Sequence, residues 1–454
     1  PLVTFSFCPL AHGMDRRNIG ATFGNGGRVA IFEGDMNDIL LHIQSVSPSI
    51  FAAIPRFWNK LHSSFQNELK IALENEKDSE KHKEIKDELL EKYGKSLGNR
   101  IRNIVTGGAP TADDVFSFLR MCFYHASVAN GYGATEVGGI TQDSRVIANK
   151  GTTVKLVDVP EMGYFTTDKP YPRGEICVKK QHMMTGYHKN PDATKAAFTD
   201  DGFFRTGDIG QQINTDQFEI IARKKHIFKL AQGEFVAPES LENTYQSTYC
   251  VDQIFVYGNT KKEFLLGVVV PKREELLVWW DNREELSFED ICHHPDTIDF
   301  LLSELYKTGL SKSLVPYEYI RGILVEPEPF TLENKLLTGP FKVNRRGCEQ
   351  KYGPDLEKLY VEIENSEDST AKLHERLNAI IKETVTKLAN DALGESGISL
   401  NSNLVQFGLD SLTALKLSNQ IEDSLGKRIN VADLLSSNIK LEDVAVAITS
   451  NSQP

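Results

Sequence analysis

The stretch FGLDSLTALKL, residues 407–417, predicts a short loop that leads into a helix. After Asp410, the apolar residues Leu412, Leu415 and Ile421 follow at spacings of three and six residues, which is typical of one helix face. Asp410 followed by Ser411 would be a good helix N-cap even without any other role. Gly408 can adopt backbone angles that other residues rarely reach, so the Ser411 hydroxyl is expected at an exposed helix start. A helix start also favours the negative charge of an attached phosphate.

Apolar residues on both sides of the glycine, Phe407 and Leu409, are expected to anchor this loop. Upstream, apolar residues repeat every three or four positions, which predicts an amphipathic helix. Residues 371–450 are therefore expected to form a small, mainly helical domain. Residues 361–370 before it are acidic and polar without apolar periodicity, a composition typical of a linker. The residues of the predicted helix face are Leu373, Leu377, Ile380, Ile381, Val385 and Leu388.

The loop and its helical flanks resemble acyl and peptidyl carrier proteins. FGLDSLTALKL matches their signature, and the flanks from Leu373 to Ile448 match their size. The resemblance implies an all-α four-helix domain in which Ser411 receives 4′-phosphopantetheine from a separate phosphopantetheinyl transferase. A thiol with a pKa of about 8.5 accepts acyl groups far better at neutral pH than a hydroxyl does. An activity that charges such a thiol is therefore expected upstream.

Residues 2–178 alternate between apolar strands and helices, which predicts α/β layering, and strand-rich sequence continues to about residue 222. We therefore expect residues 1–223 to form one α/β subdomain. One example of the alternation is the strand-like stretch 101–106, followed by a Gly-Gly-Ala-Pro turn and a helix from Thr111. Between residues 74 and 95 both charge signs recur at helical spacing, which predicts a solvated surface helix.

A smaller α+β unit is expected over residues 224–360. It contains strand-like stretches near 253–258 and 265–271. The basic segment at residues 223–225 opens this unit, and we place a hinge between the two subdomains there.

The segment NGYGATE, residues 130–136, is a candidate nucleotide site. Its glycines would let the backbone approach a nucleotide. Thr135 offers a hydroxyl to phosphate, and Glu136 offers a hard oxygen to Mg²⁺. Two further segments, GGAP at 107–110 and GFFRTGD at 202–208, would be ordinary turns if they stood alone.

The order of these motifs resembles the adenylate-forming superfamily of acyl-CoA ligases, peptide-synthetase adenylation domains and luciferases. The resemblance implies ATP as substrate, an adenine pocket between the two glycine turns, and ribose contacts from Asp208 and Arg223. Lys225 stands at the hinge position, where many members of the superfamily carry Asp. The implied nucleotide-binding residues are Gly107, Gly108, Ala109, Asn130, Gly131, Tyr132, Gly133, Asp208 and Arg223.

The same resemblance implies a catalytic set. Lys342 in LTGPFK matches the C-terminal lysine of the superfamily, whose ammonium would offset developing negative charge by an amount on the order of several kcal/mol. Thr135 and Glu136 belong to this set, with Glu136 as the Mg²⁺ ligand. His12 in FCPLAHGM would lie beside the acyl pocket. The alternatives are a surface lysine for Lys342 and a core histidine for His12.

Four longer motifs narrow the resemblance to carboxylic acid reductases, in which adenylation, carrier and reductase domains are fused. This resemblance implies ATP-dependent activation of a fatty or aromatic acid to acyl-AMP and its transfer to the arm on Ser411. Reduction to an aldehyde would use NADPH in a reductase domain outside this sequence. The motifs are GNGG at 24–27, VDVPEMGYFTTDKPYPRGEI at 157–176, KLAQGEFV at 229–236 and PFTLENKLLTG at 329–339.

Two alternatives stay open at this point: a long-chain acyl-CoA ligase with an appended carrier, and an inactive carrier-bearing scaffold. The sequence contains no Ser/Thr/Gly-rich phosphate loop ending in lysine, and no GxxGxxG dinucleotide motif follows Ile448. We therefore expect an N-terminally truncated chain that adenylates poorly by itself.

Composition excludes several other classes. The formal net charge of −12 disfavours nucleic acid as a partner, and no apolar run is long enough to cross a bilayer. The cysteines are widely spaced without a CxxC pair, which argues against a zinc site or a disulfide framework and favours the cytoplasm. Peripheral membrane association would fit a long-chain fatty acid substrate. The cysteines are Cys8, Cys122, Cys177, Cys250, Cys292 and Cys348.

Overall fold

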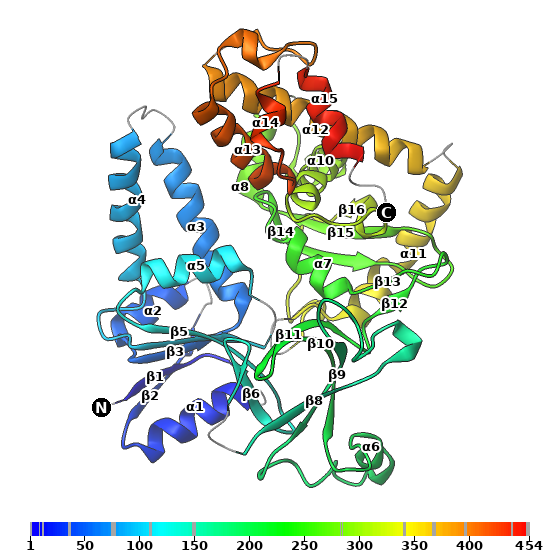
Figure 1. The fold of residues 1–454 in the computed structure, drawn as a ribbon. Coiled ribbons are helices and arrows are strands. Elements are labelled where there is room, and N and C mark those ends of the chain that lie inside the picture. The colour runs from blue at the N-terminus through cyan, green and yellow to red at the C-terminus, as the bar shows by residue number, and fades with distance from the viewer. Residues whose placement is uncertain are drawn as a thin grey trace. The chain divides into compact units, whose positions relative to one another are not determined.

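The computed structural model divides the chain into two compact units (Figure 1). Unit one comprises Pro1–Ile227 and Leu337–Lys342, and unit two comprises Phe228–Leu336 and Val343–Pro454. The structure describes residues 2–8, 10, 13–34, 38–73, 79–108, 111–147, 151–281, 283, 285–338, 342–365, 369–394, 397–436 and 439–450.

Within the described residues, unit one is built on an eleven-stranded sheet in the order β2-β1-β3-β4-β5-β6-β7-β11-β10-β9-β8. Strands β1 to β5 pair in parallel, and the pairs from β5–β6 to β8–β9 are antiparallel. The strands are β1 (Val3–Ser6), β2 (Arg28–Ile31), β3 (Ile50–Ala53), β4 (Asn103–Gly107), β5 (Ser127–Ala134), β6 (Gly138–Gln142), β7 (Arg145–Val146), β8 (Thr153–Val157), β9 (Arg173–Lys179), β10 (Phe204–Asn214) and β11 (Gln217–Arg223).

Helices cover both faces of the parallel strands, with α1 on one side and α3 to α5 on the other (Figure 1). Aromatic side chains fill the space between the sheet and the helices α3 to α5. There the ring of Phe51 on β3 meets the ring of Trp58 on α3 edge to face, with 5.5 Å between the ring centroids. Because both faces are covered, the parallel strands can be apolar throughout, which explains the α/β pattern of the sequence. The helices are α1 (Gly13–Gly24), α2 (Ile39–Val46), α3 (Pro55–Leu73), α4 (Ser79–Gly94), α5 (Asp113–Cys122), the 3₁₀ turn η3 (Pro160–Met162) and α6 (Pro191–Ala196).

Local predictions for unit one are confirmed with small shifts. The charged stretch forms the largely exposed helix α4, and the stretch predicted at 101–106 forms β4. The helix expected from Thr111 begins at Asp113 as α5, whose two acidic residues in the first turn favour a helix start.

Unit two contains a three-stranded sheet in the order β14-β15-β16 and a small hairpin of β12 and β13. Ile254 and Val256 join the core shared with α7 and α10, while Phe255 between them lies under the Arg345 guanidinium of α11. Both faces are thus covered, so β15 is an unbroken apolar run. The elements are β12 (Phe228–Lys229), β13 (Phe235–Val236), α7 (Pro238–Tyr245), β14 (Val251–Tyr257), β15 (Leu265–Pro271), α8 (Arg273–Trp280), α9 (Phe288–His293), α10 (Pro295–Ser311), η4 (Pro316–Glu318), β16 (Ile320–Val325) and α11 (Arg345–Asn365).

The C-terminal part of unit two is helical, as expected. Its core includes Val385, Leu417 and Ile421, which are fully buried. Helix α11 extends to Asn365, further than the linker composition suggested, because glutamates are good helix formers and a solvated last turn needs no apolar face. The elements are α12 (Ser369–Leu393), η5 (Leu404–Phe407), α13 (Ser411–Leu425), α14 (Val431–Leu434) and α15 (Leu441–Ser450).

Two general expectations can be compared with the structure. All six cysteines are free and buried. Burial raises the pKa of the Cys177 thiol to about 12, so this thiol stays protonated at neutral pH. Among the helices that the structure describes, none is both long enough and apolar enough to cross a membrane.

Candidate functional sites

The two glycine turns of unit one lie side by side. Gly107 and Gly131 are register partners on the parallel strands β4 and β5, near the carboxyl end of β4. A Cβ atom on Gly107 would lie 2.4 Å from the Gly131 carbonyl oxygen, so only glycine fits there. Carboxyl ends of parallel strands are a common location for ligand sites. The structure thus brings the predicted walls of the adenine pocket together, except Ala109, which lies outside the described residues.

Asp208 is the most buried charged group of the candidate nucleotide site. Its side chain is 3% exposed, and Asp208 and Arg223 are register partners on β10 and β11. The Arg223 Nε atom lies 3.1 Å from one carboxylate oxygen. The Tyr132 hydroxyl donates to the other oxygen at 2.7 Å. Residues distant in sequence therefore hold one carboxylate in a fixed orientation.

The environment keeps Tyr132 a hydrogen-bond donor. Burial, followed by the negative charge of Asp208, raises the pKa of the Tyr132 phenol well above 10. The phenol therefore keeps its proton at neutral pH. A carboxylate has about four acceptor positions, so Asp208 can accept from Tyr132 and Arg223 and also from the hydroxyls of a ribose.

Glu136 follows β5 and is half-buried. The Tyr187 hydroxyl donates to its Oε1 atom at 2.9 Å, and burial together with Glu136 raises the pKa of Tyr187. The backbone N–H of Met184 donates to the Glu136 carbonyl at 2.7 Å. Thr135 beside it is exposed, as a residue that meets phosphate needs to be.

Glu136 fits a Mg²⁺ ion only in part. In the portion of the chain with described coordinates, no group of three or more His, Cys, Asp or Glu side chains could hold a metal ion. Mg²⁺ in nucleotide sites is often bound by one or two carboxylates together with phosphate oxygens and water. A single carboxylate is therefore compatible with Mg²⁺ that arrives with ATP.

The turn that carries Lys342 is closed by two hydrogen bonds between Thr338 and Lys342. The Thr338 backbone N–H donates to the Lys342 carbonyl at 2.8 Å, and the Thr338 hydroxyl accepts from the Lys342 N–H at 3.3 Å. Residues 339–341 between them lie outside the described residues, as does His12. The roles of Lys342 and His12 stay predictions.

The hinge candidate Lys225 lies in the turn after β11. The Lys224 backbone N–H donates to the Gly207 carbonyl at 2.8 Å, and the His226 N–H donates to the Arg223 carbonyl at 3.0 Å. The division between the units falls after Ile227, two residues beyond Lys225. A hinge movement at Lys225 stays a prediction, as do the domain limits given above.

Ser411 is the first residue of α13 and is exposed. The Asp410 side chain caps the helix by accepting from the Thr413 N–H at 2.8 Å, and this bond lowers the pKa of Asp410. Gly408 has a φ of +90°, which confirms the expected need for glycine. Leu409 is buried and anchors the loop. The anchor role expected of Phe407 is wrong, because this side chain is 37% exposed.

Sequence reasoning missed several supporting residues, above all Glu175 on β9. It is buried, and its carboxylate contacts Arg205 at 3.0 Å. The available signal was a glutamate within the strand GEICV, whose neighbours are apolar, since a charged residue in a buried strand needs a partner. Tyr187 gave no comparable signal.

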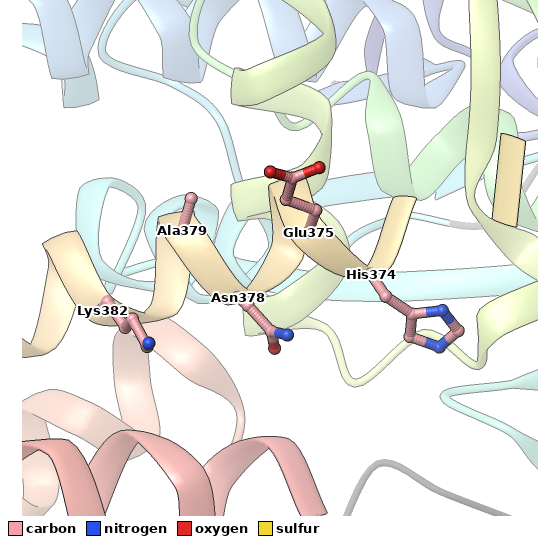
Figure 2. A pocket seen from close by; sticks show the side chains of 5 residues that line it. All are labelled: His374, Glu375, Asn378, Ala379 and Lys382. Carbon is pink, nitrogen blue, oxygen red and sulfur yellow. The ribbon is translucent and has the colours of Figure 1, made fainter. Parts of the chain in front are cut away.

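An open surface hollow of about 660 Å³ lies along α12 of unit two. Its lining comes from this helix alone. Figure 2 shows that Glu375 and Ala379 leave the helix on one side while His374, Asn378 and Lys382 leave it on the other. These side chains do not converge on a common point, and none belongs to the predicted sites.

Two families of known proteins match different parts of this chain. The family of AMP-binding enzymes matches residues 2–188, and the phosphopantetheine attachment site family matches residues 383–447. A carboxylic acid reductase of Mycobacterium tuberculosis is 33% identical over 96% of this chain and 36% of its own length. Long-chain-fatty-acid–CoA ligase 5 of Mus musculus is 35% identical over 80% of this chain and 56% of its own length.

A solved structure matches almost the whole chain. It is the A-PCP didomain of carboxylic acid reductase from Segniliparus rugosus in complex with AMP. The two chains are 31% identical with a TM-score of 0.71, and the match covers 99% of this chain and 61% of the other. The full-length reductases are longer, and the present chain spans about a third of the length of the curated reductases it matches.

Proposed function

Since this chain belongs to the AMP-binding enzymes and carries a phosphopantetheine attachment domain in the order found in carboxylic acid reductases, we propose that it activates a carboxylic acid and loads it onto Ser411. One observation carries the proposal: the similarity to an adenylation and carrier didomain solved with AMP extends over 99% of the chain. The buried Asp208 and the exposed Ser411 supply the side chains that the two steps require.

The first step joins the acid to AMP. A carboxylate oxygen attacks the α-phosphorus of ATP, and the bond to the β-phosphate breaks, so that pyrophosphate leaves with the electron pair. Asp208 and Arg223 would hold the ribose, and Glu136 would hold Mg²⁺, which supplies neutralising charge for the phosphates. The Lys342 ammonium would offset charge on the α-phosphate in the transition state.

The second step uses the carrier domain. The phosphopantetheine arm would supply a thiol for the acyl group. The bond between the acyl carbon and the AMP phosphate oxygen would break as the thioester forms, so that AMP leaves with the electron pair and the thiol proton passes to solvent. Ser411 fits as the attachment point because its hydroxyl is exposed at a helix start, where the phosphate of the arm is favoured.

The wider setting follows from the same proposal. The acid would be a fatty or aromatic one, and a phosphopantetheinyl transferase would modify Ser411. A reductase domain that uses NADPH would release the product as an aldehyde. The six free, buried thiols fit a reducing compartment, and we place the reaction in the cytoplasm.

The test separates the two steps. The chain is first loaded with phosphopantetheine and then given a synthetic acyl-AMP, which makes ATP binding unnecessary. We expect intact-protein mass spectrometry to show an acyl group on the arm and AMP in solution. AMP binding is measured separately by calorimetry. A chain that binds neither AMP nor acyl-AMP would contradict the proposal and favour the inactive carrier-bearing scaffold.

A second candidate, an acyl-CoA ligase with an appended carrier, is favoured by the 35% identity to the mouse ligase. That similarity covers 80% of the chain. The thiol acceptor distinguishes the two candidates. If free coenzyme A accepts the acyl group from acyl-AMP equally well in wild type and in the Ser411→Ala variant, the ligase is correct.

A further inference from the structure

Strand β10 contains a bulge directly before Asp208. Arg205 pairs with Cys177 on β9, but the next register pair is Ile209 with Glu175. Three residues, 206–208, therefore face a single residue on β9 and leave the regular ladder between β10 and β9. Gly207 at the centre has a φ of +71°, which favours glycine. Asp208 occupies its last position, so the geometry of the bulge determines where the Asp208 carboxylate lies.

Side chains replace the ladder partners that the bulge loses. The Gly207 N–H donates to Glu175 Oε1 at 3.3 Å, and the Asp208 N–H donates to the Thr206 hydroxyl oxygen at 3.1 Å. The Thr206 hydroxyl in turn donates to the Ile176 carbonyl at 2.8 Å. A buried amide without an acceptor is costly, so these side chains stabilise the bulge. Glu175 supplies the carboxylate of the set.

Glu175 also connects the bulge to the residues around it. Its other oxygen, Oε2, lies 3.0 Å from Arg205 Nη1 and 4.0 Å from Lys224 Nζ. Lys224 follows Arg223 in the chain, and its backbone N–H donates to the Gly207 carbonyl at 2.8 Å. The Glu175 carboxylate therefore contacts the residue before the bulge, the bulge itself and the neighbour of Arg223.

Burial makes the Glu175 carboxylate dependent on its partners. The Glu175 side chain is 5% exposed, and a buried carboxylate is stable only while its charge is paired and hydrogen-bonded. Lys224 is anchored further by Glu161 at 2.9 Å. Movement of the bulge would separate these charges, and the pairing of the buried Glu175 carboxylate therefore opposes such movement.

We infer that Glu175 is a positioning residue for ribose recognition, which rests on the function proposed above. It acts on Asp208 through the Gly207 amide and on Arg223 through Lys224. Loss of the carboxylate displaces both ribose-binding side chains together. The adenine walls at Gly107 and Gly131 belong to other strands and keep their geometry.

The nucleotide arm of the test compares AMP with 2′,3′-dideoxy-AMP, which lacks both ribose hydroxyls. Calorimetry on the full chain gives the ratio of the two affinities. We expect wild type to favour AMP by about tenfold or more, since hydrogen bonds to charged groups are strong. In Glu175→Ala the ratio should fall toward one, with dideoxy-AMP affinity changed less than about threefold. If Glu175→Ala weakens the binding of both ligands equally, the ratio of the two affinities stays unchanged, and this result would overturn the inference.

The variants include an internal control and a milder substitution. Glu175→Gln keeps an oxygen acceptor for the Gly207 amide without the charge, so its ratio should lie between those of wild type and Glu175→Ala. Glu219→Ala removes an exposed carboxylate from the neighbouring strand β11 and should leave the ratio unchanged.

A second arm uses no nucleotide, so it is independent of the proposed function. Hydrogen exchange followed by mass spectrometry reports the protection of the amides in residues 204–209. We expect faster exchange there in Glu175→Ala than in wild type or Glu219→Ala. Unchanged exchange would overturn the inference. Failure of wild type to prefer AMP, together with faster exchange in the variant, would instead contradict the ribose-binding role of Asp208.

Discussion

The nucleotide site and the carrier site differ in how far apart their residues stand in the sequence. Around Ser411, the capping side chains of Asn403 and Asp410 accept from backbone amides only two and three residues further along the chain. Around Asp208, the contacts come from strands β5, β9, β10 and β11. A continuous motif therefore describes the first site almost completely, whereas the second exists only when the strands pair in the correct register.

The two sites also differ in burial. Asp208 and Glu175 are buried carboxylates, whereas Ser411 and Asp410 are exposed. Removing one member of a buried charged network leaves the other without compensation. Removing an exposed residue leaves its neighbours solvated. Substitution of Ser411 should thus change chemistry alone, whereas substitutions at the nucleotide site should change binding and stability together.

The largest effect is expected for Ser411→Ala. Without its hydroxyl the chain has no atom at this position to which the arm can be attached, so phosphopantetheine transfer should be lost completely. The affinity for AMP and the thermal unfolding temperature should stay at wild-type values, because Ser411 is exposed. Intact-protein mass spectrometry measures the attachment. Ser424→Ala, on the same helix, should be modified normally, and any arm on Ser411→Ala would show that the attachment site is elsewhere.

Asp208→Asn should affect both binding and stability. The amide keeps one acceptor oxygen but loses the charge that pairs with Arg223. We expect AMP affinity to fall by about 10- to 100-fold, equivalent to roughly 1.5–3 kcal/mol for a hydrogen bond to a charged group. Calorimetry measures this, and thermal unfolding should shift downward in parallel.

Asp216→Asn is the matched control for that change. Asp216 precedes β11 in the same hairpin and pairs with Arg145 on the surface, at 3.1 Å. Surface ion pairs contribute little, so affinity and unfolding temperature should barely change. Equal effects of the two substitutions would contradict the contrast between buried and exposed charges.

This contrast explains what the sequence could predict. Asp410 and Gly408 were found from local rules, because capping and positive φ depend on a few neighbouring residues. The strand β15 was also predictable, because its apolar run is unbroken. Glu175 and Tyr187 were not found, because their partners become neighbours only through strand pairing and chain packing. Phe407 was assigned wrongly, because apolar character alone does not decide which side chain faces the core.

Tyr132→Phe should sharpen the comparison with a smaller change. The ring remains, but Asp208 loses the donor at 2.7 Å. We expect AMP affinity to fall by about tenfold, or roughly 1.4 kcal/mol. Because the pKa of Tyr132 is raised well above 10, its hydroxyl keeps the proton, and the ratio between wild type and variant should stay constant from neutral pH up to pH 10. A ratio that declines within this range would show that the phenol ionises there.

The smallest effect is expected at the helix cap of the carrier site. The bond from the Thr413 amide lowers the pKa of Asp410 below its usual 3.8, so the folded state binds this proton less readily than the unfolded chain. The stabilisation is therefore complete above pH 3.8 and is lost as the pH falls through the lowered pKa.

Asp410→Asn keeps a neutral cap at every pH, whereas Asp410→Ala has none. We expect thermal unfolding of the carrier helices, followed by circular dichroism, to place wild type slightly above Asp410→Ala at about pH 6, with the gap closing toward about pH 3. The gap between Asp410→Asn and Asp410→Ala should not change with pH. A gap for wild type that persists at low pH would mean that the carboxylate charge contributes nothing to the cap, and the local description of the carrier site would then need a different stabilising contact.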